Sequence, residues 1–392
     1  MFRFILTLCV ALAFAFPSMG ADSNTSKLPD WTLVIFMSSD NDLSDAAIED
    51  LNELMKVGST SRVNVVVYAD SNDQDISTKI YHIQKNNKVV IKDFGKNIDS
   101  GDWHQLVDLF KIAQEKFPAQ KYLVDVWNHG NGWEKRKTNS EKGIAYDDST
   151  GNNITTPQLG EALKAIAALR GKKIEVFATD ACLMQMVEVA YEFRDEVELF
   201  ASSEEVEPDQ GWPYTEILSA ITQKPNMTPL EFATEISRLY VDSYKNGTQQ
   251  GDLATFSVVS VPELKDAIAT LPKFIDVFSE LTSMRSKIFS AIKATQSYDS
   301  PEYADLLDFF TNVRPAILSN PEAVAALDKS KAAFAKAIKF ETHFGSRVEK
   351  STGLSIWLPK KRSILLEIRY EDINFQKDLN WQKFVTSYLP KD

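Results

Sequence analysis

Two residues of the sequence carry side chains that could perform nucleophilic catalysis, and each follows an apolar run of strand length. Cys182 comes shortly after the run at 174–178, and His129 shortly after the run at 122–127. A thiolate is a strong nucleophile, and an imidazole transfers protons near neutral pH. Parallel strands end at one edge of a sheet, where reactive groups gather. On these residues alone, a Cys–His hydrolase fits as well as a structural histidine with a buried, inert thiol.

The neighbouring residues set further expectations for this pair. A helical pattern over 183–193 follows Cys182, so its thiol would lie near the positive end of a helix dipole, which lowers a thiol pKa. Glycines on both sides of Asn131 would let the backbone after His129 bend close to a substrate. The other histidines fall in an expected hairpin or in helical segments, where solvated or locally hydrogen-bonded roles are the simpler interpretation: His82, His104 and His343.

The first 20 residues have the pattern of a secretory signal peptide. A basic residue precedes an apolar run at 4–16, and small residues offer a cleavage site near Gly20 or Ala21. This run is shorter than the roughly 20 residues that span a bilayer, and no later stretch is long and uncharged enough to do so. We therefore expect an exported protein (secreted, periplasmic or cell-surface associated) without a transmembrane anchor. Removal of the signal peptide would leave Cys182 as the single cysteine, which excludes an internal disulfide.

The charge balance of the 392-residue chain limits the classes of partner. It holds 43 Lys and Arg residues against 55 Asp and Glu residues, a formal net charge of −12. Nucleic acid binding requires clustered cations that neutralise phosphates, so we expect no nucleic acid partner. An acidic surface suits cationic ligands, although most of these charges are expected to be solvated. The hydrophobic content of 44% is ordinary for a globular protein with a sizeable core.

Apolar runs of strand length alternate with helical patterns up to about residue 260. Strands are expected at 31–37, 63–69, 122–127, 174–178 and 199–202, with a hairpin formed by 78–84 and 88–93. Helices are expected at 43–55 (with an Asp or Ser cap), 101–117, 155–169 and 183–193. This alternation predicts an α/β fold with a mainly parallel sheet that helices flank on both faces.

Helical patterns dominate after residue 261. Helices opened by prolines are expected over 262–293, 301–318 and 321–340, followed by a strand at 353–358 and a final helix around 379–388. We therefore divide the chain into four parts: a signal peptide (1–20), an α/β core (21–260), a helical insertion or subdomain (261–350), and a returning strand with a C-terminal helix (351–392).

Five segments, in this order along the chain, resemble the clostripain family of cysteine peptidases. They are WTLVIFMSSDN at 31–41, NHGNGW at 128–133, TDACLM at 179–184 with Glu188 beyond it, the stretch from ASSEE to GWPY at 201–214, and GLSIWLP at 353–359. The similarity extends over most of the expected mature chain. It implies the caspase-like fold that this family shares with gingipains, legumains and separases.

The resemblance also implies roles for individual residues. Cys182 would attack the carbonyl carbon of a peptide bond and form a thioester that water hydrolyses, while His129 would protonate the leaving amine. The backbone N–H groups of Gly130 and Cys182 would stabilise the oxyanion. The substrates would be proteins or peptides with Arg or Lys before the cleaved bond.

A pocket for Arg or Lys requires carboxylates. The resemblance implies that Asp180 is one of them, and a second acid should come from the loop after the next strand. We favour Asp209 with Glu207 behind it for that acid, and Glu204 and Glu205 are the alternatives. The simpler interpretations are a helix cap for Asp180 and a solvated loop for the others.

No cofactor is required by the sequence, which has no metal-site spacing of the zinc type. The resemblance implies that calcium could be a cofactor, because some members of the family depend on it. Asp40, Asn41 and Asp42 could contribute to a calcium site, although a cap or turn is their simpler role.

The stretch 134–153 is long, polar and rich in basic residues, which suits proteolytic nicking. Members of the family are often made as zymogens that are cut between the His and Cys strands. We therefore predict self-cleavage after Lys137 or Lys142.

The leading hypothesis is an exported cysteine endopeptidase that cleaves after Arg or Lys through Cys182 and His129. One alternative is a transpeptidase or ligase of the same fold, in which an amine intercepts the thioester. The other alternative is a catalytically inactive surface binding protein on the same scaffold, which predicts an unreactive Cys182.

Overall fold

The structure is a computed structural model that describes residues 28–73, 75–133, 143–247 and 249–390. The expected signal peptide and the cleavage candidates Lys137 and Lys142 lie outside the described residues. Within the described part of the chain, no helix combines the length and the apolar character needed to cross a membrane.

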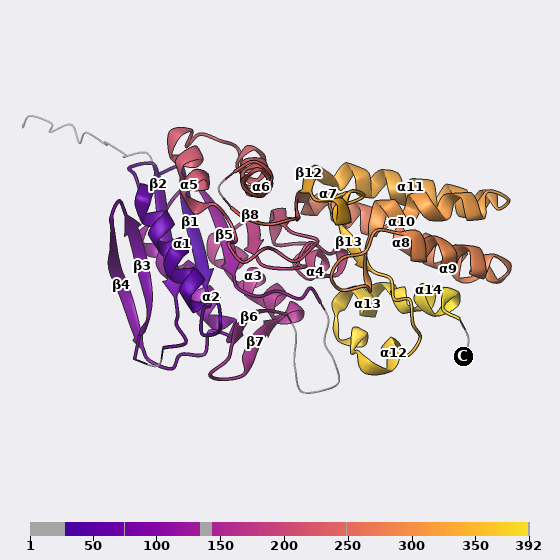
Figure 1. Ribbon diagram of the computed structural model, residues 1–392, viewed down its shortest axis with the longest axis horizontal. Helices are drawn as coiled ribbons and strands as arrows, with labels where there is room; N and C mark the ends of the chain where they lie inside the picture. Colours follow the sequence, from indigo (N-terminus) through magenta and orange to yellow (C-terminus); the bar gives the residue numbers. More distant parts are fainter. Residues whose placement is uncertain (1–27, 74, 134–142, 248, 391–392) are drawn as a thin grey trace, which may run out of the picture.

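A nine-stranded sheet forms the centre of the α/β part of the molecule (Figure 1). Its strands are β1 (Trp31–Met37), β2 (Val63–Ala69), β3 (Thr78–Gln84), β4 (Asn87–Gly95), β5 (Lys121–Trp127), β8 (Ile174–Asp180), β9 (Val197–Ser202), β10 (Ala254–Ser260) and β12 (Ile338–Phe344). They lie in the order β12-β10-β9-β8-β5-β1-β2-β3-β4. The five strands from β9 to β2 pair in parallel. The antiparallel strands β3 and β4 extend one edge, and β10 and β12 extend the other.

The central strands are apolar because both of their faces are covered. Every residue of β1, β2 and β8 is buried, as expected for parallel strands between two layers of helices. One face is covered by α1 (Ser44–Val57), α5 (Tyr214–Gln223) and α6 (Pro229–Lys245). The opposite face is covered by α2 (His104–Lys116), α3 (Thr156–Arg170) and α4 (Val187–Glu192). The α/β fold with a mainly parallel sheet and helices on both faces is therefore confirmed.

The helices after residue 260 gather at one end of the molecule (Figure 1). They are α7 (Val261–Ile268), α8 (Leu271–Ser279), α9 (Arg285–Ala294), α10 (Leu306–Val313), α11 (Pro321–Ala337) and, from the C-terminus, α14 (Trp381–Tyr388). Phe274 packs its ring against those of Phe309 and Phe384. These rings belong to the same apolar cluster as Val34 and Phe177 of the sheet. The helices thus extend the core of the sheet and do not enclose a separate one.

Several expected elements differ in the part after residue 300. The helix expected over 321–340 ends at Ala337, and the chain continues as β12 at the sheet edge. The helix expected from residue 301 is preceded by the strand β11 (Tyr303–Asp305). The expected strand at 353–358 is β13 (Ser355–Trp357), which pairs with β11 outside the main sheet. These strands are short or half-buried, so hydrophobic periodicity signals them weakly.

The remaining differences concern turns and caps. Helix α1 follows Leu43 without the expected side-chain cap, whereas Thr155 and Gln158 form a capping box at α3. The stretch 134–153 contains β6 (Gly143–Asp147), which pairs with β7 (Asn152–Thr155). The final helix is split into α13 (Asn374–Leu379) and α14 by Asn380, whose φ is 55°. The other short elements are α12 (Ile364–Glu367) and 3₁₀ turns at Thr282–Met284, Arg314–Ile317, Ser346–Val348 and Tyr370–Asp372.

Candidate active site

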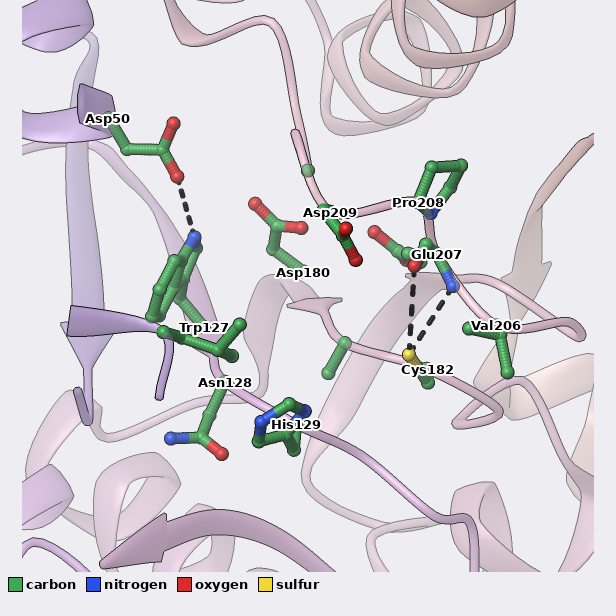
Figure 2. A pocket seen from close by; sticks show the side chains of 13 residues that line it. Asp50, Trp127, Asn128, His129, Asp180, Cys182, Val206, Glu207, Pro208 and Asp209 are labelled. Carbon is green, nitrogen blue, oxygen red and sulfur yellow. Dashed lines mark hydrogen bonds between the residues drawn. The ribbon is translucent and has the colours of Figure 1, made fainter. Parts of the chain in front are cut away.

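Cys182 and His129 line one cavity beyond the carboxyl ends of β8 and β5 (Figure 2). These two strands are parallel neighbours, and their register pairs Trp127 with Asp180. The pairing continues one residue further, because the backbone N–H of Asn128 donates to the carbonyl oxygen of Asp180 at 3.2 Å. Each candidate residue lies two positions beyond a residue of that final pair. The register of the sheet therefore places the imidazole and the thiol on the same rim.

Gly130 packs directly against the chain at Cys182. A Cβ atom added to Gly130 would lie 2.4 Å from the carbonyl oxygen of Cys182 and 3.0 Å from Cβ of Ala181. Contacts this short do not occur for real side chains, and the closer obstacle is backbone, which cannot rotate away. Glycine at position 130 thus allows the loop that carries His129 to touch the loop that carries Cys182.

The His129 ring is held from the side of the β1 loop. Its Nε2 atom lies 2.7 Å from Oδ1 of Asp42, and its ring forms a T-shaped contact with the Tyr146 ring, with 6.4 Å between ring centroids. The hydrogen bond from His129 lowers the pKa of the Asp42 carboxyl below its usual value. With Nε2 engaged by Asp42, Nδ1 is the nitrogen that remains for proton transfer in the cavity.

The Cys182 thiol is enclosed by the backbone of Glu207. Its Sγ atom accepts a hydrogen bond from the Glu207 N–H at 3.3 Å and lies 4.0 Å from the Glu207 carbonyl oxygen, as Figure 2 shows. Burial raises the pKa of the thiol to about 11, and the Glu207 N–H only partly opposes this effect. At neutral pH the resting sulfur therefore carries its proton.

The expectation that a helix dipole lowers the Cys182 pKa is wrong. The helix expected over 183–193 begins only at Val187 and ends at Glu192. Leu183 adopts a φ of 63°, so the chain turns immediately after the cysteine. A dipole effect fades within the first turn of a helix. Desolvation of the sulfur consequently dominates its pKa.

The cavity beside this pair has a volume of about 170 Å³. That is comparable with the ~150 Å³ cavities that hold one aromatic ring, so it suits a single side chain. The acids that line it are Asp50, Asp180, Glu207 and Asp209. Among its lining residues, all of them in the described part of the chain, none is Lys or Arg. The described lining of the cavity is therefore acidic, without a Lys or Arg countercharge.

Asp180 is fixed in the wall of this cavity. Its Oδ2 atom accepts hydrogen bonds from the Trp212 N–H at 3.3 Å and the Tyr214 hydroxyl at 3.0 Å. The same hydroxyl lies 3.0 Å from Oδ2 of Asp125, a buried acid on β5. A Cβ atom on Gly211 would lie 3.2 Å from the Asp180 carboxylate, so that chain passes close by. Burial raises the pKa of Asp180 to about 6, and its contacts are those of a pocket wall and not of a helix cap.

Glu207 directs its carboxyl group at Asp180, and burial together with the nearby Asp180 charge raises its pKa well above the usual value. Neither Glu207 oxygen has a hydrogen-bond partner among the described residues. Of two neighbouring buried acids, the one with the higher pKa holds its proton more tightly, so Glu207 is the better candidate to be protonated. Asp209 lies at the exposed mouth of the cavity.

The other two candidate acids point elsewhere. Glu204 accepts a hydrogen bond from the Gly353 N–H at 3.0 Å. Glu205 accepts hydrogen bonds from the N–H groups of Val206 and Asp299, both at 2.9 Å. Neither residue lines the cavity. Of the four acids weighed from the sequence, the structure thus brings Glu207 and Asp209 to Cys182.

Sequence reasoning missed Asp50, which reaches the cavity from helix α1. It is 6% exposed, and its Oδ2 atom accepts a hydrogen bond from the Trp127 indole N–H at 2.8 Å. Asp50 lies on the buried face of α1 together with Ala47 and Leu54. The sequence did contain a signal for Asp50, because an acid on the apolar face of a helix is buried and therefore needs a partner or a function.

Of the residues considered for calcium, Asn41 and Asp42 have hydrogen-bond partners in other segments. The Asn41 amide donates to the Tyr146 carbonyl oxygen at 2.7 Å, and Asp42 is engaged by His129. Asp40 instead approaches two acids from other segments, Asp70 and Asp147, and the three offer oxygens within 4.8 Å of one another. Calcium takes six to eight oxygen ligands, so these carboxylates supply part of such a shell. An acidic cluster of this kind does not by itself establish a cation site.

The fold is the caspase-like α/β fold, and solved structures share it. A secreted C11 cysteine protease from Bacteroides thetaiotaomicron, solved with an irreversible peptide inhibitor, is 20% identical with a TM-score of 0.66, over 91% of this chain and 99% of that one. An inactive zymogen C11 protease from Parabacteroides distasonis is 21% identical with a TM-score of 0.67, over 90% and 99%. At this level of identity the likeness is one of fold.

The clostripain family model matches residues 35–388, so the chain belongs to the clostripain family. Clostripain from Hathewaya histolytica is 23% identical over 304 residues. This match covers 64% of the present chain and 57% of that relative. The chain therefore aligns with little more than half of that curated relative's length.

Proposed function

We propose that the protein is an exported cysteine endopeptidase that cleaves peptide bonds after Arg or Lys, with Cys182 as nucleophile and His129 as proton-transfer group. The observation that carries this proposal is the shared cavity, in which a thiol and an imidazole adjoin four acids and, among the residues that the structure describes, no Lys or Arg. Membership of the clostripain family supports it. A cavity that concentrates negative charge beside a nucleophile selects a positively charged side chain.

The first chemical step follows from the protonated state of the thiol. Because burial raises the pKa of Cys182 to about 11, its proton has to move to His129 as the sulfur attacks the carbonyl carbon of the substrate. The new C–S bond then forms while the carbonyl π electrons move to oxygen. When the C–N bond breaks, the imidazolium returns its proton to the departing amine. Water subsequently attacks the thioester, releases the acid product and restores the thiol.

The backbone N–H groups of Gly130 and Cys182 are our candidates for the oxyanion donors. Their support is the packing of Gly130 against the Cys182 carbonyl, which sets the two backbones side by side. Donors held in place before the reaction stabilise the developing charge without reorganisation. A side chain at position 130 would separate the two loops.

Export and self-processing belong to the same proposal. The pattern at 1–20 supports export, and N-terminal sequencing of protein from the producing cells tests it. For self-cleavage after Lys137 or Lys142, the support is the basic stretch between the two loops. A relative in Parabacteroides distasonis was solved as an inactive zymogen. Cleavage that occurs equally in wild type and Cys182→Ala would contradict self-processing.

Fluorogenic peptides that end in Arg, Lys, Asp or Leu, incubated with the reduced protein, test the function. We expect hydrolysis of the Arg and Lys peptides alone, and none by Cys182→Ala. Mass spectrometry of the products, with and without an added amine nucleophile, separates hydrolysis from transpeptidation. If neither the intact nor the processed chain cleaves any of the four peptides, the proposal is overturned in favour of a binding protein.

A further inference from the structure

We propose that Asp50 on helix α1 is the distal carboxylate of the specificity pocket and makes the enzyme prefer arginine over lysine. This inference rests on the proposed function and deepens it, because the pocket that selects a basic residue acquires a means to discriminate between the two. Asp50 lines the cavity that also contains Cys182 and Asp180. It comes from a different segment than the acids of the Cys182 and 204–209 loops.

The orientation of Asp50 supports this role. In Figure 2 its carboxyl group points toward Asp180, which lies between Asp50 and Cys182 in that view. The Trp127 indole N–H holds Oδ2 at 2.8 Å. Within the described residues, Oδ1 of Asp50 has no hydrogen-bond donor, although the residue is only 6% exposed. One oxygen is thus fixed by the protein, and the other remains for a ligand.

The charge environment indicates which kind of ligand the cavity would bind. Burial and the neighbouring Asp180 charge raise the pKa of Asp50 well above its usual value. Buried acids without a countercharge are unfavourable unless they are protonated or paired. No Lys or Arg lines this cavity among the described residues. A cation that enters the cavity would therefore meet the carboxyl groups of Asp50 and Asp180, neither of which has a basic partner among the described residues.

The geometry of two separated carboxylates favours a guanidinium group. Its planar fork has five N–H donors that point in different directions, so it can bond to both acids at once. A lysine ammonium is a compact charge with three donors, and the Asp180 and Asp209 carboxylates nearer to Cys182 are sufficient for it. Loss of Asp50 should therefore weaken arginine recognition and leave lysine recognition nearly intact.

The test compares matched peptides that differ only in Arg or Lys before the cleaved bond. For Asp50→Asn we expect kcat/KM to fall about 10- to 100-fold with the Arg peptide, the range for losing a hydrogen bond to a charged group, and less than about 3-fold with the Lys peptide. The asparagine carbonyl can still accept the Trp127 N–H, so the fold should persist. Glu49→Gln is the matched control, because Glu49 is an exposed acid next to Asp50 on the same helix. This variant should leave kcat/KM unchanged with both peptides.

Binding to Cys182→Ala protein provides a readout that does not depend on catalysis. We expect n-butylguanidinium to bind at least about 5-fold more tightly than n-pentylammonium, and the difference to disappear when Asp50→Asn is added. Equal losses with both peptides, or no loss with either, overturn the inference. If wild type cleaves neither peptide, the proposed function fails, and the binding comparison alone decides the role of Asp50.

Discussion

Oδ1 of Asp42 lies 2.7 Å from Nε2 of His129. Asp42 follows strand β1 and His129 follows strand β5, and these strands are parallel neighbours in the sheet. The contact therefore joins two loops at the rim that also carries Cys182. The Asp42 side chain is 79% exposed and that of His129 is 43% exposed. A contact this exposed contributes little to stability, so its expected effect is on the orientation of the imidazole.

We expect Asp42→Ala to lower kcat about 3- to 10-fold with little change in KM, because a loosened imidazole transfers protons less efficiently. Asp42→Asn should retain most of the activity, since its amide oxygen can still accept from Nε2. Asp45→Ala is the control, because Asp45 is an exposed acid in the first turn of α1. Equal activities for wild type and Asp42→Ala would show that the contact has no catalytic role.

Alkylation of Cys182 in the protein without substrate should be slow and strongly dependent on pH. Only the thiolate reacts with iodoacetamide, and burial raises the pKa of Cys182 to about 11. For the chain without residues 1–20, we expect the rate of modification to rise about tenfold per pH unit between pH 7 and 9.5. Mass spectrometry measures the rate, and Cys182→Ala shows the background. A rate that is constant over this range would indicate a thiolate already present at pH 7.

Cleavage of Arg and Lys peptides should weaken in acid. Burial raises the pKa of Asp180 from 3.8 to about 6, so its carboxylate charge is lost as the pH falls through about 6. We expect kcat/KM, which reports the free enzyme, to fall below pH 6 because the pocket attracts the substrate cation less. In Asp180→Asn the activity should be low throughout, and this acid limb should be absent. A wild-type profile that is flat from pH 5 to 7 would contradict the assignment.

The same raised pKa predicts an opposite effect on stability. A carboxyl with a raised pKa in the folded state contributes stability below its unfolded pKa of 3.8, and that contribution is lost as the pH rises through about 6. Asp180→Asn should therefore have a higher Tm than wild type at pH 7.5, and the gain should shrink toward pH 4. Thermal unfolding at the two pH values measures the difference. A gain that is larger at pH 4 would contradict the sign.

Substitution of Gly130 should abolish activity even where the protein folds. In Gly130→Ala the new Cβ would lie 2.4 Å from the Cys182 carbonyl oxygen, so the two catalytic loops have to move apart. We expect kcat/KM to fall more than about 100-fold, since displacements near 1 Å are this costly in active sites. Gly171→Ala is the control, because Gly171 has a φ of 72° with nothing within 4 Å, and it should lose stability but not activity. Full activity in Gly130→Ala would exclude the close packing as a requirement.

Much of the fold was predictable because its signals are local. Continuous apolar runs identified β1, β2, β5 and β8. Polar and apolar residues do not alternate in these strands, because helices cover both faces of the sheet. The short or half-buried strands β11 and β12 were missed, because their residues resemble those of the neighbouring helices. The helix after Cys182 was expected four residues too early, since a turn at Leu183 leaves no periodic signal.

The sequence by itself determined which residues could react. A thiol and an imidazole each follow an apolar strand. Asp180 lies two residues before the thiol, and further acids lie in the loop after the next strand. Tertiary structure decided their partners and their electrostatics. Strand order brought Asp42 to His129. Helix α1 carried Asp50, which precedes Cys182 by 132 residues in the chain, to the cavity that Cys182 lines. The tertiary structure also encloses the Cys182 sulfur. Burial therefore raises the pKa of Cys182 to about 11, whereas the sequence had suggested that a helix dipole lowers it. Desolvation depends on every segment packed around a group, and no local pattern encodes that.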